Sequence, residues 1–394
     1  MHWGAWALSL CLLPCAAFSY QSLSSSSSGR REPLNPGRKY TTLERMKIRH
    51  LAAVHAQRMA FARQRVAPPA SPGPYRDYRS VIHVHAEDSA HTGGTRQQVL
   101  QAAAAAAVDV VMLTDHNGPM QDTWRGKRGK VLFIAGSEDD HALRFPAIPE
   151  FPELRFLSHL DENPEMSPAN AIGMEIYNRH SDSSDETTFN REFLQILDDP
   201  ERWAALAGAF HRFPDEFFAA QQDYLSVFIH RWDLETARHP FTGIAANDAH
   251  QNQVYRGIAF DPYAINFRNV STHILAEQLD EPSIRNALLH SRAYVSHDWL
   301  CDPAGFRFTA TLNGKAHEMG SQVRPGARLQ VQLPLSASIK VVHNGRLFAS
   351  REASSWSGIV RAEGAYRIEA WLTVDGEQRP WIYSNPIYVA PEPH

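Results

Sequence analysis

Short, largely apolar runs that end in polar residues recur between residues 80 and 250 of the chain. The first run, at residues 80–84, is rich in β-branched residues and predicts a buried strand. His83 and His85 stand two positions apart at its end, and His91 follows in the loop beyond. Because alternate residues of a strand share a face, we expect His83 and His85 to point the same way, with His91 returning from the loop.

The same pattern is repeated along the chain. The further strands that it predicts span residues 109–114, 130–135, 154–158, 173–177 and 241–246. The polar residues that follow these strands are Asp115 and His116, Glu138, His159, Asn178, and Asp248 with His250. A helix capped by Thr95 separates the first two strands, which is typical of a βαβ unit with parallel strands. Since the carboxyl ends of parallel strands share one rim, these side chains are expected to converge there.

The regions on either side of this pattern differ from it. Thr41 and Glu44 form a capping-box pattern, so residues 41–75 are predicted to hold an N-terminal helix and a proline-rich connector. Residues 76–299 would form the α/β part. Alternating runs after residue 300, separated by Asn-Gly and Asp-Gly pairs at 313–314, 344–345 and 375–376, predict β-hairpins. We interpret residues 300–394 as a small all-β, immunoglobulin-like sandwich.

Composition and charge narrow the class of protein. The 394 residues exceed the usual size of one core, which favours two domains. The 43% hydrophobic and 21% charged residues are ordinary for a globular protein. A formal net charge of −4 offers no general attraction for nucleic acid, so no nucleic-acid partner is expected and a small-molecule substrate is favoured.

The first 19 residues are apolar and end in small residues, as in a secretory signal peptide cleaved after Ser19. The alternative is an uncleaved anchor, although a membrane span typically needs about 20 apolar residues. Export, periplasmic or secreted, is therefore expected, with no membrane span left after cleavage. Residues 20–40 are predicted to be a flexible Ser/Pro-rich linker. Cleavage would remove Cys11 and Cys15 and leave Cys301 without an intramolecular disulfide partner.

Four motifs occur in a characteristic order. They are His83-Val84-His85, Thr114-Asp115-His116-Asn117, Gly136-Ser137-Glu138 and Asp248-Ala249-His250. In this order they resemble the PHP superfamily, named from polymerase and histidinol phosphatase. The resemblance implies a distorted (β/α)7-type PHP barrel with metal ions at its carboxyl rim. The segments 173–178 and 381–389 are similar to the CehA/McbA branch of metallohydrolases.

The resemblance also implies a set of metal ligands. His83 and His85 would bind one ion together with Asp248 and a bridging Glu138. His116 and His159 would hold a second ion against the same Glu138, and His91 and His250 would serve a third. His91 takes a role that many members give to an aspartate at position 90, which is Ala90 here. His141 and His211 stay open as alternatives to His159.

Imidazole and carboxylate ligands suit two or three divalent ions of Zn, Mn or Fe. A carboxylate between two ions holds them roughly 3.5–4 Å apart, which suits a bridging hydroxide as the nucleophile. Glu138 and His116 are therefore catalytic candidates. Asp115 is another, as a partner of the His116 imidazole or a proton shuttle, although it could simply cap the following turn.

These observations predict a metal-dependent hydrolase, and a phosphoester is the favoured substrate. The CehA/McbA resemblance leaves a carbamate, ester or amide hydrolase open. A non-catalytic metal-containing binding protein is the third alternative.

Overall fold

The structure is a computed structural model that describes residues 38–66, 73–116, 123–184 and 186–391. The expected signal peptide and most of the expected linker lie outside the described residues. The helices are α1 (Thr42–Arg45), α2 (Ile48–Gln64), α3 (Arg96–Ala105), α4 (Arg179–Ser184), α5 (Thr187–Asp198), α6 (Pro200–Arg212), α7 (Pro214–Phe218), η1 (Ala219–Gln221), α8 (Ser226–Thr236), α9 (Tyr263–Asn269) and α10 (Glu281–Leu289). Among the described residues, no helix is both long and apolar enough to cross a membrane.

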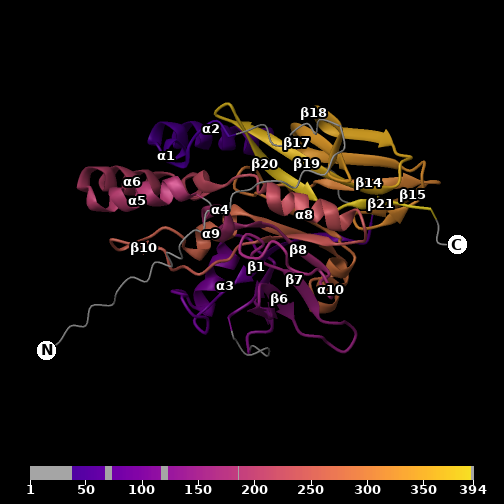
Figure 1. Cartoon of the computed structure of the whole chain (residues 1–394), viewed down its shortest axis with the longest axis horizontal. Coiled ribbons are helices and arrows are strands. Elements are labelled where there is room, and N and C mark those ends of the chain that lie inside the picture. Colours follow the sequence, from indigo (N-terminus) through magenta and orange to yellow (C-terminus); the bar gives the residue numbers. More distant parts are fainter. Residues whose placement is uncertain (1–37, 67–72, 117–122, 185, 392–394) are drawn as a thin grey trace. The chain divides into compact units, whose positions relative to one another are not determined.

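The strands fall into a large sheet, a smaller sheet and one short pair. Those before residue 300 are β1 (Arg76–Val84), β2 (Val110–Leu113), β3 (Gly126–Arg128), β4 (Val131–Ala135), β5 (Ser137–Asp139), β6 (Ala142–Phe145), β7 (Leu154–Leu157), β8 (Gly173–Asn178), β9 (Thr242–Ala246), β10 (Val254–Tyr255), β11 (Ile258–Ala259), β12 (Ser271–Ala276) and β13 (Ala293–Ser296). Those after it are β14 (Arg307–Leu312), β15 (Lys315–Glu318), β16 (Gln322–Val323), β17 (Arg328–His343), β18 (Arg346–Ile359), β19 (Gly364–Val374), β20 (Glu377–Ser384) and β21 (Ile387–Val389). The chain is thus mixed α/β, as predicted (Figure 1).

The large sheet has 14 strands, with the main order β15-β14-β17-β19-β20-β13-β12-β1-β2-β4-β3. β1, β2 and β4 are parallel, as the βαβ pattern predicted. Helices α3 and α9 cover them through an apolar cluster that includes Val99, Val111, Phe133 and Phe267. Thr95 caps α3 with a capping box, as expected. The parallel strands therefore end together, which brings the carboxyl ends of β1 and β2 to one side.

The large sheet continues past residue 300, where the sequence predicted a small all-β sandwich. β20 pairs with β13 in antiparallel fashion, and Tyr383 lies opposite Val295. This pairing satisfies the backbone groups of β13, which would otherwise form an open sheet edge. The predicted hairpin turns at 313–314, 344–345 and 375–376 are confirmed, since they connect β14 to β15, β17 to β18 and β19 to β20. All six turn residues have positive φ, as two-residue hairpin turns require.

The smaller sheet has the order β5-β6-β7-β8-β9. β7, β8 and β9 are parallel, but β5, β6 and β7 are antiparallel, so the uninterrupted parallel series expected from the sequence does not occur. Gly136 precedes β5 at a close approach, because a Cβ atom there would lie 2.4 Å from the carbonyl oxygen of Arg144. Parallel bridges between Val84 and Ala249 and between His116 and Glu138 connect the two sheets at their strand ends.

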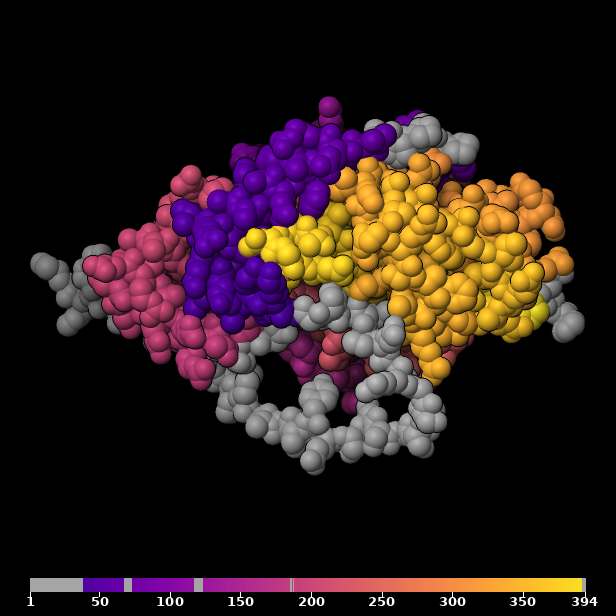
Figure 2. Space-filling view, turned by 90° about the horizontal axis from the view of Figure 1, so that it is seen from above, coloured from indigo at the N-terminus to yellow at the C-terminus, as the bar shows by residue number. Residues whose placement is uncertain are grey.

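The N-terminal helical segment packs against the C-terminal strands (Figure 2). Thr41 and Glu44 form the predicted capping box, but the helix is interrupted between α1 and α2. Arg45 is buried and its Nη2 lies 2.6 Å from Glu377 Oε1, while His50 Nδ1 lies 2.7 Å from Asp375 Oδ2. This segment is therefore integrated into the fold rather than tethered to it.

Candidate metal centre

The ends of five strands bring together most of the residues that the sequence singled out. β1 leads to His83 and His85, β2 to His116, β7 to His159 and β9 to Asp248 and His250, while Glu138 lies within β5. A backbone hydrogen bond holds the segments after β1 and β9 together, because the amide of His85 donates to the carbonyl of Ala249 at 3.0 Å. Residues from distant parts of the sequence therefore face one another in a single cluster.

Glu138 lies at the centre of this cluster. Its Oε2 is 3.1 Å from His83 Nε2, 3.5 Å from His85 Nε2 and 3.2 Å from His116 Nδ1. Its other oxygen, Oε1, is 2.9 Å from His159 Nε2. One buried carboxylate thus contacts four imidazoles, and its two oxygens face different ones.

Asp248 is a second shared carboxylate. Its Oδ1 lies 3.5 Å from the Nε2 atoms of both His83 and His85 and 3.3 Å from His250 Nδ1. Its Oδ2 lies 3.3 Å from His159 Nε2 and 3.5 Å from His180 Nδ1. Asp248 therefore shares His83, His85 and His159 with Glu138.

These atoms form three overlapping groups that could hold metal ions, each with ligand atoms within 4.8 Å of one another. The groups are His83 with His85 and Glu138, His83 with His159 and Asp248, and His85 with His116 and His250. This grouping differs from the implied assignment, because His116 groups with His85 and His250 instead of with His159. The His85 ring contacts both other rings, with centroids 4.5 Å from His116 and 4.0 Å from His250.

Several of the converging atoms are buried and have no hydrogen-bond partner among the described residues. They are His83 Nε2, His85 Nε2, Glu138 Oε2 and both carboxylate oxygens of Asp248. Leaving buried polar atoms unpaired is costly, about 1–3 kcal/mol each and more for charged groups. A divalent cation would satisfy imidazole nitrogens and carboxylate oxygens together, so the donor set fits a metal of the Zn, Mn or Fe type.

The buried carboxylates of the cluster shift the pKa values of the imidazoles around them. Burial alone would lower the pKa of His83, yet the carboxylates of Asp248 and Glu138 raise it well above its ordinary value. The pKa of His159 is likewise raised to about 10 against the effect of burial, chiefly by its hydrogen bond with Glu138. Burial lowers the pKa of His85 to about 3, so this ring is neutral at pH 7.

His83 and His85 reach the cluster by a different backbone path from the regular strand that we expected. β1 ends at Val84, and its register with β2 shifts between Ile82 and Val84. His83 has a φ of 65°, in the left-handed region. His159 and Asp248 also have positive φ, at 49° and 42°. Such conformations cost about 1–3 kcal/mol each and concentrate at functional sites.

Glu175 on β8 was not predicted to belong to the site. Its Oε1 lies 2.7 Å from His83 Nδ1, and its Oε2 accepts from the His159 amide at 3.1 Å and from Asn178 Nδ2 at 2.9 Å. A carboxylate on the far nitrogen of a ligand histidine fixes its tautomer and orientation. A single acidic residue between apolar neighbours in a buried strand was the signal in the sequence.

The structure does not bring His91 to the cluster. His91 is exposed and belongs to none of the three ligand groups. Its backbone carbonyl accepts a hydrogen bond from Asn252 Nδ2 at 2.8 Å. His141 and His211, the alternatives to His159, also lie outside the three groups. The turn after β1 thus carries His91 away from the position that the resemblance implied.

Asp115 also lies outside the three groups, although it is buried nearby. Its Oδ1 accepts from the Ala86 amide at 2.6 Å, and its Oδ2 accepts from Arg96 Nη2 at 2.7 Å. These contacts connect the end of β2 to the loop after β1 and to α3. The geometry therefore gives Asp115 a positioning role.

Two imidazoles of the cluster are partly exposed to solvent. The side chains of His116 and His180 are 32% and 55% exposed, whereas those of His83 and His85 are fully buried. The Nδ1 atom of His180 lies 3.5 Å from Asp248 Oδ2. A small molecule would therefore approach past His116 and His180.

No protein-family model matches this sequence, and no curated protein matches it. Among solved structures, one similar chain is a two-domain protein from Bacteroides vulgatus, described as containing a predicted PHP-like metal-dependent phosphoesterase. It is 13% identical, and the match covers 82% of this chain and 98% of that chain with a TM-score of 0.35.

Proposed function

We propose that this protein is a metal-dependent hydrolase that acts on a small-molecule phosphoester. The observation that carries the proposal is the set of buried, unpaired ligand atoms on His83, His85, Glu138 and Asp248. Atoms of this kind attract a cation in preference to remaining desolvated and unpaired. Their arrangement around shared carboxylates is the one used by sites that hold more than one ion.

Two or three divalent ions would be held by this chain's own residues. His83, His85 and Glu138 would hold one ion, and His159 with Asp248 would hold a second beside His83. His116 and His250 would complete a third position with His85. When bound, such ions supply a nucleophilic water at neutral pH and polarise the substrate oxygen.

The exposed imidazoles have separate tasks in this proposal. His180 contacts Asp248, and this contact raises the pKa of His180 above its ordinary value. A protonated, partly exposed His180 can donate its Nε2 proton to the leaving oxygen. His116, which is partly exposed, would orient the substrate and hold the third ion together with His85 and His250.

The family proposed is the PHP superfamily, with a PHP-type barrel at 76–299 and an immunoglobulin-like region at 300–394. The CehA/McbA branch is the finer proposal within it. Export is also proposed, with a signal peptide cleaved after Ser19. Mass spectrometry of the mature N-terminus would test the cleavage, and a chain that begins at Met1 would contradict it.

The activity can be tested with the full chain after its metals have been removed by a chelator and then restored with Mn²⁺, Zn²⁺ or Fe²⁺. The reconstituted protein is assayed on a chromogenic phosphomonoester, a phosphodiester and a carbamate, with metal content measured in parallel. Turnover of a phosphoester that depends on metal is expected. Turnover of the carbamate alone would mean that the protein hydrolyses a carbamate and not a phosphoester. If no substrate is turned over although metals are bound, the proposal of an enzyme is contradicted.

Glu138→Gln tests the shared carboxylate directly. Loss of charge between the imidazoles should remove at least one equivalent of metal and lower kcat/KM by at least about 100-fold. His141→Gln is the matched control, because His141 is exposed to a similar extent as His116 and lies outside the ligand groups. Full metal content in Glu138→Gln would contradict the proposed role.

A further inference from the structure

A wide polar groove lies on the sheet formed by β14, β15, β17 and β18, which are labelled in Figure 1. Its volume is about 1070 Å³, just above the roughly 300–1,000 Å³ that is usual for small-molecule sites. Residues 73–75 also line it, together with His290 and Arg292. None of its described lining residues belongs to the ligand groups of the metal centre. The groove is therefore a separate feature, with room for an extended ligand.

The floor of the groove is made of uncharged polar side chains from neighbouring strands. Thr309 lies opposite Gln330 and Gln330 opposite Ser357, so these three residues share one face of the sheet. The uncharged polar residues of the floor are Thr309, Thr311, Gln330, Gln332, Ser355 and Ser357. Within the described residues, their one side-chain hydrogen bond joins Thr311 Oγ1 to Gln330 Oε1, at 2.7 Å. Because hydroxyl and amide groups both donate and accept, this floor suits a ligand with many hydroxyl groups.

Charged side chains also line the groove, and cations outnumber anions among them. Arg292, Arg307 and Arg351 are lining residues, whereas Glu318 is the one carboxylate among the described lining residues. Burial raises the pKa of Glu318 above its ordinary value. The groove thus carries a local positive charge on a chain whose formal net charge is −4. Such a local excess of cations favours an anionic ligand.

The side chain of Arg292 is half-buried in the groove and lacks a polar partner. Its guanidinium lies 4.7 Å from the centroid of the Tyr75 ring, but no hydrogen bond or ion pair joins this side chain to another described residue. Its Nε is buried, whereas its two Nη atoms are not among the buried atoms without partners and so reach solvent. The Nη atoms are therefore the donors that a ligand in the groove can meet.

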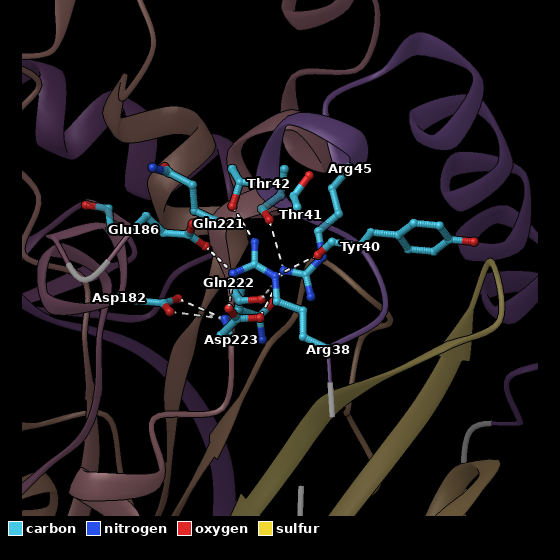
Figure 3. Close-up of polar contacts among 12 residues, drawn as sticks. Arg38, Tyr40, Thr41, Thr42, Arg45, Asp182, Glu186, Gln221, Gln222 and Asp223 are labelled. Carbon is cyan, nitrogen blue, oxygen red and sulfur yellow. Dashed lines mark hydrogen bonds and ion pairs between the residues drawn. The ribbon is translucent and has the colours of Figure 1, made fainter. Parts of the chain in front are cut away.

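Several other arginines of the chain are paired with its own carboxylates. Nη1 atoms of Arg45 and Arg38 lie 2.9 and 2.7 Å from Asp223 (Figure 3). The buried Arg367 lies 2.7 Å from Asp233. A half-buried guanidinium without an anion is costly in comparison, because it has lost part of its hydration. Arg292 is thus placed to bind an anionic group that the chain itself does not supply.

We propose that this groove binds an acidic oligosaccharide, a chain of uronic acid residues whose carboxylates meet Arg292 and Arg351. The sugar hydroxyls would donate to Glu318 and exchange hydrogen bonds with the uncharged floor. Arginine suits the carboxylates because it stays charged and presents several donors in a plane. A nucleic acid suits the groove less well, since its affinity depends on repeated cations along the phosphates, and here the floor is mostly uncharged. The C-terminal strands would thus attach the protein to an acidic polysaccharide.

Binding can be measured by calorimetric titration of the full chain with tetragalacturonate, maltotetraose and tetraglutamate. Tetragalacturonate is expected to bind at least about 10-fold more tightly than maltotetraose, because a charge-assisted hydrogen bond is worth this factor or more. Absence of tetragalacturonate binding, or equal binding of the neutral maltotetraose, would overturn the proposal. Equal binding of tetraglutamate would mean that the groove recognises charge alone, and would overturn the sugar as its ligand.

Arg292→Met should weaken tetragalacturonate binding by at least about 10-fold. Arg351→Met at an exposed position provides the same test if Arg292→Met does not fold. Arg346→Met is the matched control, since Arg346 is exposed on the same strand β18 and does not line the groove. Gln332→Ala removes a neutral hydrogen bond and should weaken binding by about 3- to 10-fold. Unchanged binding in the folded arginine variants of the groove would overturn the proposal.

Metal removal separates this inference from the proposed function. Tetragalacturonate should bind with the same affinity before and after treatment of the full chain with a chelator, because no described lining residue is a candidate metal ligand. Loss of binding with the metal would place the sugar at the metal centre and overturn the groove. Metal-independent binding in a protein that hydrolyses no phosphoester would support the groove and contradict the phosphoesterase.

Discussion

The Nδ1 atom of His83 lies 2.7 Å from Oε1 of Glu175, and both side chains are buried. The contact leaves Nε2 of His83 facing Glu138 and Asp248. A histidine held in this way has a fixed ring orientation and presents one defined nitrogen to a metal.

Glu175→Gln should therefore weaken metal binding without removing a ligand. The expected loss is about 10- to 100-fold in affinity, measured by competition with a chromogenic chelator. Glu235→Gln is the matched control, because Glu235 is a buried acid on α8 that pairs with Arg231 away from the centre. Wild-type affinity in Glu175→Gln would mean that Glu175 does not tune the site.

His91 and His250 were predicted to serve the same ion, but they lie in different surroundings. His250 stacks on His85 at 4.0 Å, whereas His91 is exposed and outside the ligand groups. His250→Ala should lower the bound metal per chain, and His91→Ala should leave it unchanged. Metal analysis of both variants after identical reconstitution decides this, and loss of metal from His91→Ala would restore the assignment made from the resemblance.

Asp115→Asn separates a positioning role from proton transfer. The substitution weakens the contact with the buried Arg96, so the free energy of unfolding should fall by about 1–3 kcal/mol, measured by urea denaturation. The metal content and the shape of the pH–activity profile should not change. If Asp115 were a proton shuttle, the variant would instead lose one limb of that profile.

His273 makes stability depend on pH far from the metal ligands. It lies between Asp77 and Asp298, at 2.8 and 3.3 Å, and their charges raise the pKa of His273 from 6.5 to about 10 despite its burial. Because the folded-state pKa is the higher one, the stabilisation is complete below about pH 6.5 and is lost as pH rises through about 10. The slope for one proton is at most about 1.4 kcal/mol per pH unit.

His273→Gln should lower the free energy of unfolding at pH 7 and make its alkaline decline shallower than in the wild type. Urea denaturation from pH 6 to 10 measures both, and His290→Gln at an exposed position is the control. Parallel declines in His273→Gln and the wild type would rule out the linkage.

Much of the local structure could be predicted from the order of residues. The capping boxes at Thr41 and Thr95 and the Asn-Gly and Asp-Gly turns depend on backbone contacts a few residues apart. The strands leading to His116, His159 and Asp248 were also predicted, because apolar runs report burial. Residue types at strand ends then indicated the chemistry of the centre.

Other features depend on contacts between segments that are far apart in the chain. The β5–β6 hairpin, the pairing of β20 with β13 and the bulge at His83 are decided by which strands meet and in which register. Glu175 lies 92 residues after His83 in the sequence, so the local hydrophobic pattern could not predict their contact.

The sequence by itself determined the mixed α/β class, the short-range turns and caps, and most of the imidazoles and carboxylates of the candidate centre. Only the tertiary structure decided that Glu138 and Asp248 share three imidazoles, and that His91 and Asp115 stand outside the ligand groups. The physical reason is the distance along the chain over which each effect acts. Propensity and burial patterns act over a few residues, whereas the position of a ligand atom depends on the register of whole strands, where a shift of one residue turns a side chain to the other face.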